Sequence, residues 1–114
     1  MTVSELKALI SAASLTPSVP EDAEVTCGYT GDLLSWVMAH AEAGMAWVTV
    51  QTNMNVPAVA VLSEMACIIL PDDIHPEQEI LDKAAQQDMP VLVSPLTAYE
   101  ICGRMAASGI PAHS

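Results

Sequence analysis

Short apolar segments recur along the chain at a spacing that fits one strand followed by one helix. Residues 25–29, 45–51, 66–70 and 90–94 read VTCGY, MAWVTVQ, ACIIL and PVLVS, and most are rich in residues that strands favour. Their starts lie about 20–24 residues apart, and each interval holds one segment with apolar residues at helical spacing. The pattern predicts βαβ units, and therefore a mostly parallel sheet covered by helices on both faces.

The remaining segments complete this prediction. Thr2 and Glu5 form a T-x-x-E capping box, which predicts a first helix over about residues 3–13. The next segment, residues 14–24, contains prolines and acids and is predicted to be a solvated connection. Further helices are predicted from Asp32 to Gly44, over residues 56–65, from Pro76, and from Ser94-Pro95 to Gly109. We expect one domain, residues 1–114, of the α/β class: a three-layer α/β/α sandwich with a four- to five-stranded sheet.

The charge balance excludes one large class of function. Fourteen acids face three bases, Lys7, Lys83 and Arg104, so the formal charge is −11. Nucleic-acid binders need clustered Lys and Arg, and this chain has no such cluster. The first ten residues show no cationic stretch followed by an apolar one, so no secretory signal is predicted. We expect a cytoplasmic protein with no membrane partner.

The metal-ligating residue types are too dispersed to form a recognisable site. Cys27, Cys67 and Cys102 lie far apart in the sequence, with no CxxC spacing, so buried, reduced thiols are predicted. His75 follows Asp72 and Asp73, and these residues form either a small metal site or, as we favour, a solvated loop. We therefore predict no metal and no cofactor.

A ligand site is predicted at one edge of the sheet. In an open parallel sheet, ligands bind beyond the carboxyl ends of the strands, where loops lead into helices. Residue types suited to a small-ligand pocket there are Gly28, Tyr29, Asp32, Thr52, Asn53, Asn55, Ser94 and Thr97. The alternative is that Asp32, Asn55 and Ser94 are only helix caps. Residues 28–31 carry a glycine pair that we interpret as a turn, and neither GxGxxG nor a P-loop motif is present.

Catalysis is not predicted. Nothing in the sequence ties a hydroxyl or thiol to a base, and His40 lies in an apolar helical segment, as a packed or surface residue. Trp36 and Trp47 stand out because aromatic residues are scarce. Each belongs either to the core or to a partner surface, where Trp is enriched.

Taken in their order along the chain, these segments resemble a stand-alone DRTGG domain over nearly the whole length of the sequence. The stretches that carry the resemblance are EVTCGYTGDLLSWVMAHAEAG, AWVTVQTNMNVPAVAVLSEMACIIL and PVLVSPLTAYEICGRM. The naming motif differs, because residues 22–28 read DAEVTCG where family members carry Asp-Arg-x-x-Gly-Gly or a close variant. The resemblance implies an α/β/α sandwich like the N-terminal domain of HPr kinase/phosphorylase, and it implies a homodimer.

The same resemblance implies a regulatory rather than a catalytic role. Relatives occur beside CBS domains in regulatory pyrophosphatases, so we expect a non-catalytic, ligand-sensing domain that binds an adenine nucleotide or similar metabolite at the loop edge. The alternative is an interaction or scaffold subunit of a redox, hydrogenase-like complex with no small ligand of its own. Some relatives are labelled iron–sulfur-binding, but the cysteine spacing gives that label no ligands.

Overall fold

The computed structural model describes residues 1–112. In that range the elements are, in chain order, α1 (Val3–Leu9), β1 (Ala13–Ser14), β2 (Cys27–Thr30), α2 (Leu34–His40), β3 (Met45–Val48), α3 (Val56–Leu62), β4 (Cys67–Leu70), α4 (Gln78–Gln86), β5 (Val91–Val93) and α5 (Ala98–Ala107). No helix in the described part of the chain is long and apolar enough to cross a bilayer.

The strands form one mixed sheet in the order β1-β5-β4-β3-β2. Strands β2, β3, β4 and β5 are parallel to one another, whereas β1 pairs with β5 in the antiparallel sense. The predicted mostly parallel sheet is therefore confirmed. Strand β1 was not expected, because its two residues lie where the sequence predicts the end of a helix and a polar connection.

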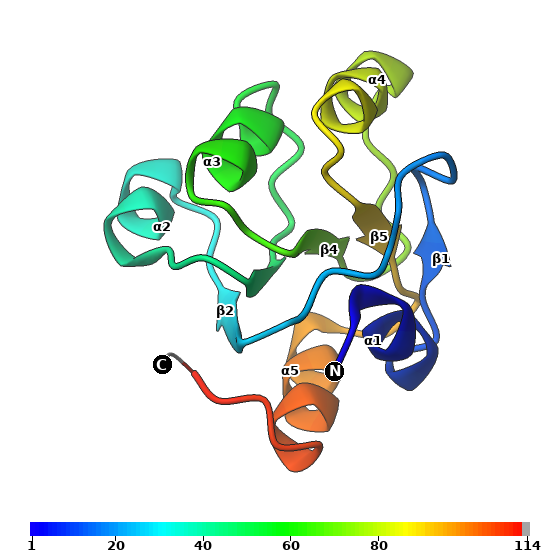
Figure 1. The fold of residues 1–114 in the computed structure, drawn as a ribbon, viewed down its shortest axis with the longest axis vertical. Helices are drawn as coiled ribbons and strands as arrows, with labels where there is room; N and C mark the ends of the chain where they lie inside the picture. The colour runs from blue at the N-terminus through cyan, green and yellow to red at the C-terminus, as the bar shows by residue number, and fades with distance from the viewer. Residues whose placement is uncertain (113–114) are drawn as a thin grey trace.

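Helices cover both faces of the sheet, which confirms the three-layer sandwich. Figure 1 shows α2, α3 and α4 on one face and α1 and α5 on the other. Apolar strand residues alternate between the two layers, as the pleat requires. Trp47, Ile68 and Leu70 are buried under α2, α3 and α4, whereas Val48, Ile69 and Leu92 are buried under α1 and α5. The unusually apolar strands β3, β4 and β5 are buried along their whole length.

The helix ends agree only in part with the predicted caps. The Thr2–Glu5 capping box is present, although α1 ends at Leu9 rather than near residue 13. Helix α3 is helical as predicted, with Pro57 in its first turn, and Asn55 occupies its N-cap position without a side-chain hydrogen bond. Helix α4 begins after Glu77, one residue beyond Pro76. These differences fall where local propensity competes with tertiary contacts.

Gly44 has a different task from the one predicted. Helix α2 ends at His40 with Ala41 as its C-cap, so Gly44 does not mark the end of this helix, although the sequence predicts that it does. Gly44 instead has φ +80° in the turn that leads into β3. Its N–H donates to the Glu64 carbonyl at 2.9 Å, and its carbonyl accepts from Thr26 N–H at 2.9 Å. The turn is thus hydrogen-bonded on both sides of a residue in the left-handed region.

The winding of the sheet determines what kind of cleft it can offer. From β2 to β5 the strands are adjacent in chain order, and α2, α3 and α4 all connect them across the same face. The strand order does not reverse among these four strands, so they lack the switch point that opens a ligand crevice in doubly wound sheets. A ligand at this edge must therefore bind the loops themselves or a pocket beside them.

Candidate functional site

The loops after β2 and β3 are tied together by one carboxylate. Asp32 Oδ1 accepts hydrogen bonds from the Thr49 hydroxyl and from Val50 N–H, both at 2.8 Å. The Gln51 side-chain amide donates to the Asp32 carbonyl at 3.3 Å. Asp32 is not the N-cap of α2, because Leu33 holds that position. The alternative of Asp32 as a helix cap is therefore wrong, and its carboxylate fixes the geometry of the two loops.

The loop between β3 and α3 carries exposed polar side chains. Asn53 Oδ1 accepts from Asn55 N–H at 2.8 Å, which folds the loop before α3. Asn53 and Asn55 are exposed, and Thr52 is half-buried. We refer to Asp32, Thr52, Asn53 and Asn55 as the loop rim. Four of the eight residues selected from the sequence thus lie on two neighbouring loops.

Ser94 and Thr97 follow β5, which is two strands away from β3 in the sheet, and they have structural roles there. Ser94 is fully buried, and its hydroxyl donates to the Ile10 carbonyl at 2.7 Å while accepting from Leu96 N–H at 3.2 Å. Thr97 is the N-cap of α5 and accepts from Glu100 N–H at 3.2 Å. Thr97 rather than Ser94 caps this helix, so the cap alternative is wrong for Ser94. Both side chains are engaged within the fold, away from the loop rim.

Gly28 and Tyr29 line a cavity of about 430 Å³ beside the edge strand β2. Gly28 lies within β2 rather than in the predicted turn. A Cβ at Gly28 would come within 2.8 Å of Met105 Cε, so the absent side chain lets α5 approach the strand closely. The cavity is otherwise lined by Thr30, Cys102, Met105, Ala106, Ile110, Pro111 and Ala112. Among residues 1–112 its lining is mostly apolar and includes no Asp, Glu, Lys or Arg.

The chain after α5 closes one side of this cavity. Gly109, at φ +97°, turns the chain, and Ile110 N–H donates back to the Met105 carbonyl. The Pro111 carbonyl then accepts from Gly28 N–H at 2.8 Å, which brings the segment against the outer edge of β2. Figure 1 shows this segment returning from α5 toward β2. Sequence reasoning missed these lining residues because they meet Gly28 only through long-range packing; a glycine inside a strand was the available signal.

The three thiols are free and protonated at neutral pH. Complete burial raises the pKa of Cys67 to about 12. Desolvation also raises the pKa of Cys27 and of Cys102, and for Cys102 a hydrogen bond with Thr30 offsets part of the effect. The predicted burial is confirmed for Cys27 and Cys67, whereas Cys102 is half-buried in the cavity wall.

The histidines of the described range make local contacts. His40 Nδ1 lies 2.8 Å from the Trp36 carbonyl, and its ring packs against Trp36 and stacks on Tyr29. His75 Nε2 lies 3.2 Å from Asp73 Oδ1, and both side chains are exposed. Among residues 1–112, no three His, Cys, Asp or Glu side chains converge as metal ligands. His113 lies outside the described residues.

The two tryptophans have opposite environments. Trp47 is fully buried, and its Nε1 donates to the Gly31 carbonyl at 2.8 Å. Trp36 remains 60% exposed on α2. Of the two alternatives considered for these residues, the core applies to Trp47, and the exposure of Trp36 leaves it available to a partner.

A second hollow, of about 460 Å³, lies between α3 and α4. It is lined by Met54, Asn55, Pro57, Ala58, Val61, Leu62, Lys83, Gln86 and Gln87. Asn55 belongs both to this hollow and to the loop rim, and Lys83 is the one basic side chain that lines the hollow among residues 1–112.

Comparison with known proteins finds a similar architecture among solved structures. No protein-family model matches the chain, and no curated protein matches its sequence. Among solved structures, it is similar to the CBS and DRTGG domains of the regulatory region of the Clostridium perfringens pyrophosphatase, complexed with the activator diadenosine tetraphosphate. The TM-score is 0.70 at 12% sequence identity, and the match covers 97% of this chain but only 48% of that one. At this identity the likeness is one of fold, and the fold of this chain is DRTGG-like, as its sequence implies.

Proposed function

We propose that this chain is a non-catalytic regulatory domain that senses an adenine nucleotide or a similar metabolite, and that it acts as a homodimer. The observation that carries the proposal is the fold likeness to a regulatory region solved with a dinucleotide activator, across 97% of the chain. This chain covers 48% of that region, so the likeness supports a sensing module and carries no statement about the activity of a whole enzyme.

The loop rim supports a ligand site at the carboxyl ends of β2 and β3. The Asp32 carboxylate holds both loops in place before any ligand binds, and this preorganisation lowers the entropic cost of binding. Thr52 and Asn53 then offer a hydroxyl and a side-chain amide for hydrogen bonds to a sugar or a base. Tyr29, three residues before Asp32 in the sequence, lines the cavity with Gly28, and this cavity offers an apolar surface for a planar ring.

Charge determines how a phosphorylated ligand would bind. The chain has a formal charge of −11, Lys7 pairs with Glu21 at 2.6 Å, and Arg104 donates to the Leu9 carbonyl at 3.1 Å. Lys83, the third base, lies in the hollow between α3 and α4. Two of the three bases are therefore engaged, and a polyphosphate needs a counter-ion. We expect ATP to bind more tightly with Mg²⁺ than with a chelator.

Titration calorimetry tests the proposal with ATP, AMP and diadenosine tetraphosphate, each with and without Mg²⁺. We expect binding of at least one of the three. Thr52→Val and Asn53→Ala should weaken it, because each removes polar groups from the rim. Ser4→Ala is the control, since Ser4 is exposed on α1, away from the rim. No heat of binding for any of the three nucleotides would contradict the nucleotide part of the proposal.

Two observations support a role without catalysis. The side chain of His40 is held by the Trp36 carbonyl and by ring contacts, and the hydroxyl of Ser94 is buried and donates to the backbone. Neither residue is placed as the base or the nucleophile of a hydrolytic pair. Incubation with the bound nucleotide, followed by chromatography, should show no product; turnover abolished by a rim substitution would contradict this.

A second candidate is an interaction subunit of a redox complex, and exposed apolar residues at the start of α2 and within it favour contact with a protein partner. Leu33 and Trp36 are 66% and 60% exposed, and large exposed apolar groups of this kind mark protein contacts. Purification of the tagged chain from its native cell separates the candidates: a stoichiometric redox partner without a bound metabolite favours the second.

A further inference from the structure

The chain that follows α5 crosses from that helix to the edge of the sheet. Gly109 N–H donates to the Ala106 carbonyl and Ile110 N–H to the Met105 carbonyl, both at 3.1 Å, which is the Schellman pattern that ends a helix. Gly109 has φ +97° in this turn, and the chain leaves the helix in a new direction. We call residues 109–112 the strap. Figure 1 shows it passing from α5 toward β2.

Few contacts hold the strap in place. The Pro111 carbonyl accepts from Gly28 N–H at 2.8 Å, and within the described residues this is the one backbone hydrogen bond that holds residues 111–112. The Ile110 side chain is half-buried against the layer formed by α1 and α5, whereas Pro111 and Ala112 are exposed. Release of the strap therefore exposes far less surface than global unfolding does, so it can open while the rest of the fold stays intact.

Gly109 is placed to act as the hinge of the strap. Glycine adopts positive and negative φ with similar ease, so a change of direction there costs little. Apart from its chain neighbours, nothing in the described structure lies within 4 Å of the place where a Cβ of Gly109 would be. Gly44, which also has a positive φ, is by contrast crowded by Thr26. The space beside Gly109 therefore allows the strap to turn.

The strap covers one side of the cavity beside β2. Ile110, Pro111 and Ala112 line this cavity together with residues of β2 and α5. Its volume of about 430 Å³ falls in the range of small-molecule sites, which is about 300–1,000 Å³. A cavity of this size beside a weakly held segment is a site whose entrance that segment can widen.

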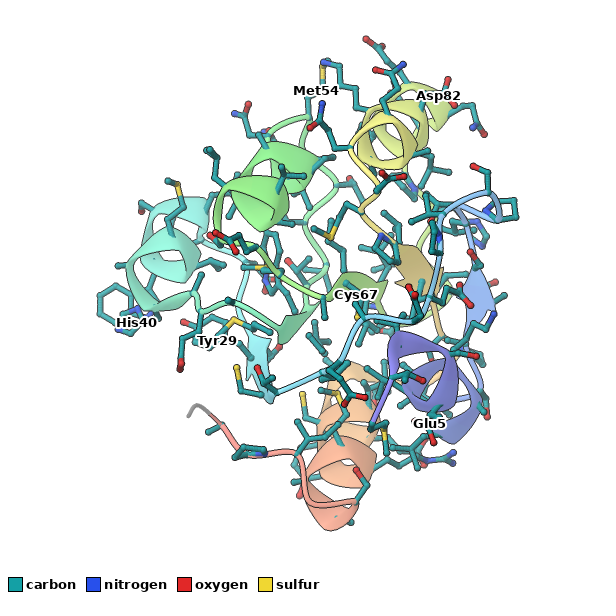
Figure 2. The ribbon with its side chains drawn as sticks, in the orientation of Figure 1. Glu5, Tyr29, His40, Met54, Cys67 and Asp82 are labelled. Atoms are coloured by element: carbon teal, nitrogen blue, oxygen red, sulfur yellow. The ribbon has the colours of Figure 1, made fainter. Side chains whose placement is uncertain are left out.

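One thiol reports on the interior of this cavity. Cys102 lies half-buried on α5 in the cavity wall, and its side chain makes a hydrogen bond with Thr30 of β2. Cys67, by contrast, is fully buried in β4. Figure 2 shows Cys67 in the middle of the molecule and Tyr29, whose strand borders the cavity, toward its outer end. Opening of the strap uncovers Cys102, whereas exposure of Cys67 requires unfolding of the sheet.

The charges around the cavity select against ions. No Asp, Glu, Lys or Arg lines it within the described part of the chain, so an ion that enters loses water without gaining a partner of opposite charge. The formal charge of −11 also repels anions from the molecule as a whole. A small uncharged molecule meets neither of these costs.

We propose that the strap is a hinged cover that controls the entry of small uncharged molecules into the cavity beside β2. In the closed form the Pro111 carbonyl is bonded to Gly28 N–H, and Ile110 packs in the layer of α1 and α5. The open form lacks both contacts and turns at Gly109. The inference goes beyond the nucleotide of the proposed function, because it concerns access to the cavity whichever molecule binds there.

Alkylation of Cys102 by iodoacetamide at neutral pH, with mass spectrometry of the modified peptide, measures entry directly. The thiol loses its proton to solvent, and the thiolate displaces iodide to form a thioether. Ile110→Ser removes the apolar side chain that holds the strap, and we expect the Cys102 rate to rise about tenfold. Leu62→Ser is the matched control, because Leu62 is 74% exposed on α3, which covers the opposite face of the sheet. It should leave the rate unchanged.

Amide hydrogen exchange measures the same opening independently. The Pro111 carbonyl protects Gly28 N–H, so Ile110→Ser should raise the Gly28 exchange rate by the same factor as the Cys102 alkylation rate. Gly109→Ala strains the closed strap at φ +97° without a steric clash, and it should raise both rates about fivefold. Equal factors at the amide and at the thiol distinguish opening of the strap from a change in the pKa of Cys102.

Urea separates this local opening from global unfolding in the wild-type chain, so the test stands even where a variant fails to fold. Opening of the strap exposes little surface, and the Cys102 and Gly28 rates should change little in urea below the unfolding transition. Alkylation of Cys67 requires unfolding and should accelerate steeply with urea.

Iodoacetate tests the selection by charge, because it matches iodoacetamide in size and reaction but carries a negative charge. The measurement is made at about 0.15 M salt, where the Debye length is about 8 Å and the charge of the distant surface is largely screened. We expect the preference of Cys102 for iodoacetamide over iodoacetate to be about fivefold greater in the folded chain than in the urea-unfolded chain.

Several results would overturn the inference. One is a pair of strap variants in which the Cys102 and Gly28 rates stay unchanged or change by different factors; another is an equal acceleration in Leu62→Ser. A wild-type Cys102 rate that follows urea as steeply as that of Cys67 would also overturn it. Equal preference for the two reagents in the folded and unfolded chains overturns only the restriction to uncharged molecules. Calorimetry measures nucleotide binding separately, so its failure remains distinguishable from each of these results.

Discussion

Gly44→Ala adds only one methyl group, but it should lower the stability of this chain strongly. Gly44 has φ +80°, in the left-handed region, where an L-residue costs about 1 kcal/mol relative to Gly. A Cβ at this position would lie 2.4 Å from Thr26 Oγ1, well inside contact distance. The backbone cannot move away easily, because Gly44 is hydrogen-bonded to Thr26 and to Glu64 on its two sides.

The clash therefore has to be relieved at Thr26. Its hydroxyl donates to the Ala43 carbonyl at 3.0 Å, and rotation of the side chain breaks that bond at a cost of about 1 kcal/mol. Together with the backbone strain, we expect Gly44→Ala to lower the free energy of unfolding by about 2–3 kcal/mol. With a urea m-value of about 1–2 kcal/mol/M, the unfolding midpoint should fall by about 1–3 M.

Two other glycines supply matched controls in the same urea titration, followed by circular dichroism. Gly109 also has a left-handed φ, +97°, but a Cβ there meets nothing within 4 Å, so Gly109→Ala should cost only about 1 kcal/mol. Gly103 lies inside α5 with open space around it, and Gly103→Ala should stabilise the protein by about 0.5–1 kcal/mol. Equal losses for Gly44→Ala and Gly109→Ala would refute the steric argument. So would a Thr26→Ala background in which Gly44→Ala costs as much as before.

Three further predictions concern other parts of the fold. Ser94→Ala leaves the buried Ile10 carbonyl without its donor, so it should lower the free energy of unfolding by about 1–3 kcal/mol in the same titration. Cys67, whose pKa is about 12, should not react with a thiol reagent at neutral pH until the protein unfolds, whereas half-buried Cys102 should react slowly in the native state. Hydrogen bonds to Thr2 in the capping box lower the pKa of Glu5 below the ordinary value of a glutamate. Its stabilising effect is therefore present above that ordinary value and is lost as pH falls through the lower value of the folded state. Glu5→Gln should flatten the pH dependence of the melting temperature in that acidic range; an unchanged profile would contradict the assignment.

The sheet and its helical layers could be predicted because their signals are local. Strands such as residues 67–70 are continuous apolar runs, and the helices between them have clear periodicity. Strand β1 could not be predicted in this way. Its two residues pair with β5, far away in the sequence, and that pairing rather than their own propensity makes them a strand.

The arrangement of the loops was predictable in part, but the tasks of their side chains were not. Parallel strands bring their carboxyl ends to one edge, so Asp32 and Asn53 lie on neighbouring loops, as expected. What each side chain does there depends on partners that the sequence does not specify: Asp32 binds the next loop, and Ser94 binds the end of α1. The cavity at Gly28 was missed because its walls come from α5 and the segment after it.

The helical layer formed by α1 and α5 is assembled from segments far apart in the chain, and this has a consequence during synthesis. Until the ribosome has released residues 98–107, the sheet face with Val48, Ile69 and Leu92 is covered only by α1. A nascent chain that lacks α5 therefore exposes an apolar surface on strands that are otherwise complete. We expect chains stalled just before residue 98 to be the aggregation-prone species, and completion of the last helix to be the step that ends this exposure.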